Sequence, residues 1–149
     1  MYLILCTRAV AKKVLRISEE DKFDFILIGL VCSHRDFRLC RELNRKLDIN
    51  LSKQDEYTVF NNKRMEDQFF SFYEYVSEED DRYNVIANKS LKGLLLPEQN
   101  QIDFLLLIRM YPMRIEEQEL IDQLKEIPIV LAAYKLDTVK LKSRENLVF

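Results

Sequence analysis

Two carboxylic residues, Glu98 and Asp103, could perform acid–base or metal chemistry if the fold brought them together. A buried carboxyl group beside another has a raised pKa, which suits a general acid. Pro97 precedes the pair, and carboxylates in turns commonly accept backbone hydrogen bonds worth about 1 kcal/mol each. The sequence therefore favours a structural role for Glu98 and Asp103, and an enzyme centred on them is the alternative.

Cys32, His34 and Cys40 are residue types that bind zinc. A fourth ligand at C-x-x-C or H-x-x-x-H spacing is missing, so we expect buried thiols and no metal. Cys32 and His34 could also form a nucleophile and base, but no third group is placed to orient the histidine. The chain has only two glycines and no phosphate-binding glycine loop, so we expect no cofactor.

A helix predicted from Ser33 to Leu47 carries five basic residues on one side. They are Arg35, Arg38, Arg41, Arg45 and Lys46. An arginine-rich helix of this kind can contact the phosphates of nucleic acid. Because three acidic residues interleave with the basic ones between positions 35 and 48, a solvated helix face is the favoured interpretation. A nucleic-acid-binding module is the alternative.

One segment carries a resemblance to a known family: Leu96-Pro97-Glu98-Gln99-Asn100-Gln101-Ile102-Asp103-Phe104. It resembles the signature I-P-E-x-x-x-V-D-Y of a bacterial protein family of about this length, and the resemblance extends from about Lys13 to the end. The family name records a motif and no activity, so the resemblance implies relatives without implying a function. Phe104 stands where the signature has tyrosine, which puts in doubt any mechanism that needs the phenol.

The composition is that of a folded globular domain. The 149 residues include nine Phe and seven Tyr but only two Gly and three Pro, which excludes collagen-like and disordered classes. We expect one α+β domain over residues 12–149, with a largely antiparallel sheet and two or three packed helices. Residues 1–11 are expected to form a loosely packed extension.

Several elements follow from apolar patterns. Lys13–Ile17 is predicted as a first strand, and Phe23–Cys32 as a buried central strand, although Ser18 and Asp21 could instead start a helix there. In the arginine-rich helix, Ser33 and Asp36 are predicted to form the N-terminal capping box. Its apolar residues fall within an arc of about 160° that should face the core. They are Phe37, Leu39, Cys40, Leu43 and Leu47.

The second half is predicted to contain mainly strands. We expect a short strand at Tyr57–Phe60, then a long aromatic hairpin whose arms are Gln68–Val76 and Tyr83–Asn88. Pro97 should separate a short strand from a second strand that begins at Ile102. A helix from Ile115 to Lys125, a strand at Ile129–Ala133 and a docked apolar end complete the chain.

Net charge and cysteine usage indicate the compartment. The formal charge is −2, with three cysteines that have no paired spacing, which favours a reducing cytoplasm. The longest apolar run is far shorter than the ~20 residues of a membrane span, so no membrane partner is expected. The favoured function is a non-catalytic domain that binds a protein or a small ligand.

Overall fold

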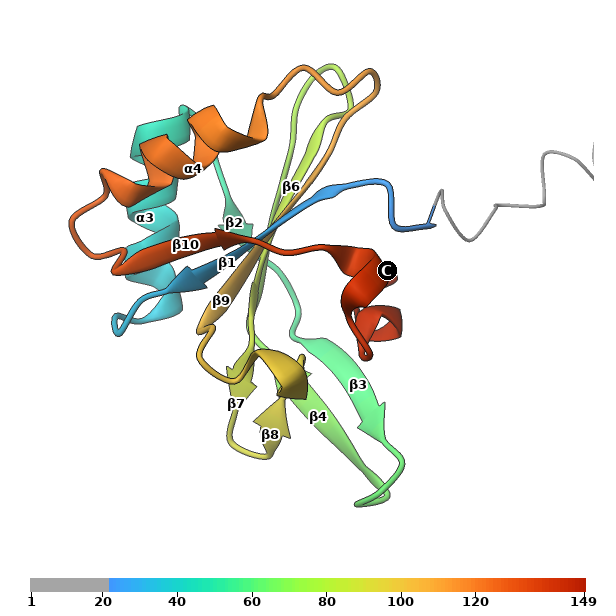
Figure 1. Ribbon diagram of the computed structural model, residues 1–149. Helices are drawn as coiled ribbons and strands as arrows, with labels where there is room; N and C mark the ends of the chain where they lie inside the picture. Colours follow the sequence, from blue (N-terminus) through green and yellow to red (C-terminus); the bar gives the residue numbers. More distant parts are fainter. Residues whose placement is uncertain (1–21) are drawn as a thin grey trace, which may run out of the picture.

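A six-stranded antiparallel sheet forms the centre of the computed structural model, which describes residues 22–149 (Figure 1). The predicted strand Lys13–Ile17 and the extension 1–11 lie outside the described residues. The strand order is β10-β1-β9-β6-β5-β2. The strands are β1 (Ile26–Val31), β2 (Ser52–Lys53), β5 (Phe72–Val76), β6 (Arg82–Ala87), β9 (Phe104–Arg109) and β10 (Ala132–Lys135). The predicted α+β class with a largely antiparallel sheet is therefore confirmed.

The inner strands β1 and β9 are buried on both faces. Alternate side chains point to opposite faces of a strand, so Leu106 and Ile108 of β9 pack on one side while Leu105 and Leu107 pack on the other. A strand covered on both faces is continuously apolar, and this pattern had predicted the strand at Phe23–Cys32. Two separate hydrophobic cores result, one on each face of the sheet.

Two helices, α3 (Asp36–Leu47) and α4 (Glu117–Lys125), cover one face of this sheet (Figure 1). The fully buried Leu43 of α3 and Leu124 of α4 belong to the same core. The side chain of Glu116 caps α4 by accepting hydrogen bonds from two backbone amides of its first turn. In the part of the chain that the structure describes, no helix has the length and apolar content of a membrane span.

The opposite face is covered by short elements and by the C-terminal segment. They are β3 (Tyr57–Asn61), β4 (Glu66–Phe70), β7 (Lys89–Ser90), β8 (Gly93–Leu94), and the 3-10 helices η1 (Pro97–Gln99), η2 (Thr138–Lys140) and η3 (Arg144–Leu147). Leu141 and Leu147 are buried in the second core, so the C-terminal segment is docked as expected. It folds as 3-10 turns.

The aromatic hairpin is only partly as predicted. β5 and β6 do pair, but the expected first arm divides at Ser71, and β4 pairs instead with β3 in a separate two-stranded sheet. Ser71 donates its hydroxyl to the Asp36 carboxylate of α3, so the chain is held by the helix where it passes from one sheet to the other. The hairpin is therefore shorter than its aromatic content indicated.

Three local predictions were wrong. Helix α3 begins at Asp36 after Arg35, without a capping box from Ser33, because Ser71 and Lys53 engage the Asp36 carboxylate. The predicted strand at Ile129–Ala133 is displaced toward the C-terminus, because the chain first makes a turn that Val130 closes on Ile127.

The third concerns Phe37, which was expected in the core but is 61% exposed. At 100° per residue, Leu39, Cys40 and Leu43 span only about 100° around the helix axis. Phe37 lies about 60° beyond that arc, close to the position of Arg41 one turn later. The buried stripe of α3 is thus narrower than the apolar stripe of its sequence.

Candidate functional site

The residues that carry the family resemblance form one loop, which we call the signature loop (residues 96–103) and which leads into β9. Within it, Glu98 holds the C-terminal segment. Its two carboxylate oxygens accept hydrogen bonds from the backbone N–H of Ser143 at 2.8 Å and from the Ser143 hydroxyl at 2.9 Å. Burial opposes ionisation of Glu98, but the bonds from Ser143 and the charge of Lys142 outweigh it and lower its pKa.

Asp103 has different partners. One carboxylate oxygen accepts the backbone N–H of Cys32 at 2.8 Å, and the other accepts Lys89 Nζ at 2.6 Å. The backbone N–H of Asp103 donates to Leu30, so this residue joins the end of β1 to the start of β9. Asp103 and Glu98 share no partner, and each has the acceptor role that the structural interpretation expects. Phe104 follows as a buried residue of the helix-side core.

Asn88 anchors the signature loop, and the motif analysis did not single it out. It is completely buried, and its side-chain amide donates to the carbonyls of Gln99 and Ile102, both at 2.9 Å. Its side-chain oxygen accepts the Leu96 N–H at 2.8 Å, and its own N–H donates to the Asp103 carbonyl. An amide has both donors and an acceptor, which explains why asparagine suits a site that must satisfy both kinds of backbone group.

Gly29 of β1 lets the loop approach the sheet. A Cβ atom at this position would lie 2.6 Å from Cδ1 of Ile102, which is closer than side chains pack. Ile102 is fully buried directly over the strand. The signature loop is therefore held through Asn88, Gly29, Asp103 and Glu98, and the carboxylates of Glu98 and Asp103 are both bonded within the protein.

The cysteine and histidine candidates do not form a site together. Cys32 and Cys40 are buried free thiols, and burial raises the pKa of Cys40 to about 12, with a further contribution from Asp36. Burial also raises the pKa of Cys32. Among residues 22–149, no group of three His, Cys, Asp or Glu side chains is arranged to hold a metal ion.

The outward side of α3 is exposed and positively charged. We call it the basic surface, and it consists of Arg35, Phe37, Arg38, Arg41 and Arg45. In the described part of the chain, Arg35, Arg38 and Arg41 make no ion pair. Arg45 lies 3.8 Å from Glu42 on the same helix, and Lys46 turns away to pair with Glu126. The structure thus places four of the five predicted basic residues on one free surface and adds Phe37 to them.

Two hollows lie beside α3. One, of about 370 Å³, lies along the helix from Phe37 to Arg45. The other, of about 760 Å³, contains Arg35 and lies against β4 and the turn between β7 and β8; we call it the adjoining groove. Its lining residues are Arg35, Glu56, Phe69, Lys89, Ser90, Leu91 and Lys92. Together the two hollows are lined by six cationic side chains and two carboxylates.

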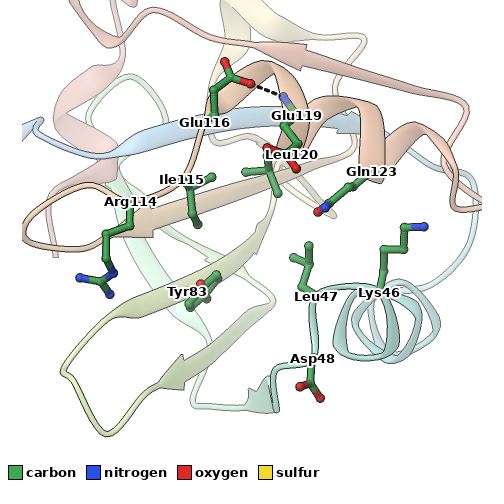
Figure 2. Close-up of a pocket in the computed structure, with 10 residues that line it drawn as sticks. All are labelled: Lys46, Leu47, Asp48, Tyr83, Arg114, Ile115, Glu116, Glu119, Leu120 and Gln123. Carbon is green, nitrogen blue, oxygen red and sulfur yellow. Dashed lines mark hydrogen bonds between the residues drawn. The ribbon is translucent and has the colours of Figure 1, made fainter.

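A third hollow, the interhelical cleft, lies between α3, α4 and β6 and has a volume of about 350 Å³ (Figure 2). Leu47, Ile115 and Leu120 supply its apolar side chains, and Figure 2 shows Tyr83 of β6 facing it from the sheet. Burial and the nearby Asp81 raise the pKa of Tyr83. The two cations of this cleft are both neutralised, Lys46 by Glu126 and Arg114 by Asp81 and Glu79.

Comparison with known proteins adds no relative from which a role could be transferred. Neither a protein-family model nor a curated protein matches the chain. The candidate sites therefore rest on their own geometry. Of the three hollows described above, the two beside α3 combine unpaired arginines with exposed aromatic side chains.

Proposed function

We propose that this protein is a non-catalytic binding domain and that it takes an anionic partner at the basic surface and the adjoining groove. The observation that carries this proposal is that Arg35, Arg38 and Arg41 are exposed and make no ion pair within residues 22–149. In the interhelical cleft, by contrast, Lys46 and Arg114 both meet carboxylates. In the adjoining groove, Lys89 pairs with Asp103 and Lys92 with Glu66.

Free arginines in this pattern work against the helix. Arg38 and Arg41 are three residues apart, and Arg41 and Arg45 are four apart, so their side chains are neighbours on the helix surface. Like charges at these spacings destabilise a helix by about 0.2–0.5 kcal/mol per pair. An anionic partner would remove that repulsion, and a planar guanidinium group binds phosphate or carboxylate through two parallel hydrogen bonds.

The absence of catalysis in the proposal is supported by the signature loop. Glu98 and Asp103 were the acid–base candidates, and both carboxylates are engaged by bonds that hold the fold. A cytoplasmic location is part of the same proposal. It is supported by the free thiols of Cys32 and Cys40, which suit a reducing compartment.

Retention on heparin or phosphocellulose tests the proposal. We expect the unmodified protein to be retained despite its net negative charge, and to elute at a lower salt concentration when Arg38 and Arg41 are both replaced by alanine. The matched control replaces Lys125 and Lys140 with alanine. Both lysines lie outside the two hollows, and their replacement removes the same total charge. No retention of the unmodified protein, or an equal effect of both double variants, would contradict the proposal.

A further inference from the structure

We infer that the anionic partner is a single-stranded nucleic acid, whose bases stack on exposed phenylalanines while its phosphates meet the arginines of α3. This inference rests on the proposed function and names the partner of the same surface. It starts from Phe37, a large aromatic ring that is 61% exposed within a row of arginines. Charge alone would attract any polyanion, and the exposed ring is what selects among them.

Phe37 and Arg41 are one helical turn apart, so the ring and the guanidinium group are neighbours on the helix surface. Proteins that bind single strands combine a positive track for the backbone with aromatic rings on which bases stack. Such stacking tolerates any base, because every base has a flat face. The basic surface supplies both parts within about three turns of one helix.

The adjoining groove continues this arrangement beyond the helix. Phe69 of β4 lines it and is 49% exposed, and Leu91 at the turn between β7 and β8 is fully exposed. Arg35, at the start of α3, lines the same groove and so connects it to the basic surface. A nucleic-acid strand that follows the arginines of α3 would therefore meet a second aromatic ring, Phe69, in the groove that Arg35 also lines.

A third phenylalanine lies on the same outward face. In the β3–β4 pair, Thr58 is opposite Phe69, and Phe60 follows two residues later on β3. Residues two apart on a strand share a face, so Phe60, which is 50% exposed, lies diagonal to Phe69. Phe60 and Phe69 thus give the β3–β4 arm, seen at the bottom of Figure 1, two exposed rings on one face.

These rings favour a single strand over the other polyanions. In a duplex the bases are stacked on one another and unavailable to a ring, so Phe37 and Phe69 would gain nothing from them. An acidic protein would pair with the arginines but offers no regular series of flat groups. The combination of free guanidinium groups with spaced, exposed rings matches a partner in which phosphates and unstacked bases alternate.

The test uses fluorescence anisotropy of labelled oligouridylate, oligothymidylate, a DNA duplex of the same length, and heparin as competitor. We expect both single strands to bind more tightly than the duplex. The Phe37→Ala variant keeps all charges and should weaken single-strand binding by about 5- to 100-fold while leaving retention on heparin unchanged. Tyr134→Ala, which removes a ring on β10 that is 48% exposed, is the control and should change nothing.

The outcomes separate this inference from the proposed function. If heparin retention depends on Arg38 and Arg41 but Phe37→Ala binds single strands normally, or if the duplex binds as tightly, the nucleic-acid inference is wrong and the anion-binding function stands. If neither heparin nor any oligonucleotide is bound, both fail. A thermal melt of Phe37→Ala shows that the variant is folded, since an exposed side chain contributes little stability.

Discussion

The signature loop and the basic surface differ in how their polar groups are satisfied. Glu98 and Asp103 of the signature loop, and Asn88, which anchors the loop from outside it, direct every side-chain oxygen to a donor of the same chain. On the basic surface, Arg35, Arg38 and Arg41 are exposed and make no ion pair within residues 22–149. A sequence motif can therefore mark residues that hold the fold together, while the surface available to a partner carries no motif.

The largest effect should come from the anchor of the loop. Replacing Asn88 with alanine leaves the Leu96 N–H and the Ile102 carbonyl without these partners, and it removes one of the two donors to the Gln99 carbonyl. We expect a loss of about 3–5 kcal/mol in the free energy of unfolding, measured by urea denaturation. Replacement of the exposed Asn50 is the control and should cost under ~0.5 kcal/mol. An Asn88→Ala protein as stable as wild type would show that Asn88 does not hold the signature loop in place.

Helix α3 has buried core residues on one side and exposed arginines on the other, so both roles can be tested within one element. Leu43→Ala should cost about 2–5 kcal/mol because Leu43 is fully buried against the sheet. Arg45→Ala should cost under ~0.5 kcal/mol because its guanidinium group is exposed. Both variants are compared by denaturant unfolding. Equal losses would mean that the basic surface serves stability after all.

Neutral replacements of the carboxylates should have intermediate effects. Glu98→Gln and Asp103→Asn each keep one acceptor oxygen and should cost only ~1 kcal/mol, whereas alanine at either position should cost more. If Glu98 and Asp103 instead served catalysis or held a metal, the mutual repulsion of their carboxylates would destabilise the folded protein. A melting temperature raised by either neutral replacement, or a thermal shift caused by divalent metal and lost in the variants, would indicate that second role.

The smallest effect should appear in acid. The pKa of Glu98 in the folded protein lies below the ordinary value of 4.5, because the bonds from Ser143 overcome the effect of burial. The stabilisation from Glu98 is therefore complete above the ordinary value and is lost as the pH falls through the folded value. We expect wild type to lose up to about 1 kcal/mol more than Glu98→Gln below that pH. Glu145→Gln, a change at an exposed carboxylate, should behave like wild type.

The fold class and the central strands could be predicted because burial on both faces leaves a direct trace in the sequence. Ile26–Val31 is continuously apolar, Phe104–Arg109 is apolar up to its last residue, and both are inner strands of the sheet. The division of the aromatic stretch at Ser71 could not be predicted. It depends on pairing with β3 and on a hydrogen bond to Asp36, and neither contact is visible in a local pattern.

The charges of the candidate site could be predicted from the sequence, but the exposed ring of Phe37 could not. The arginines of α3 follow from helical periodicity, but Phe37 was placed in the core by the same argument. Its exposure depends on how narrow a stripe of α3 the sheet can cover, which is a property of the packed structure. Asn88 was missed because a single buried amide leaves no periodic pattern in the sequence.

The strand order has a consequence for how the chain is made. β1 lies near the start of the described chain, but its two neighbours in the sheet, β9 and β10, both come from the last third. On the ribosome, β1 must therefore wait for most of the chain to be translated before it can find a pairing partner. During that wait its apolar residues and unpaired edges are open to aggregation, so production in cells should depend on chaperones and should improve at lower temperature.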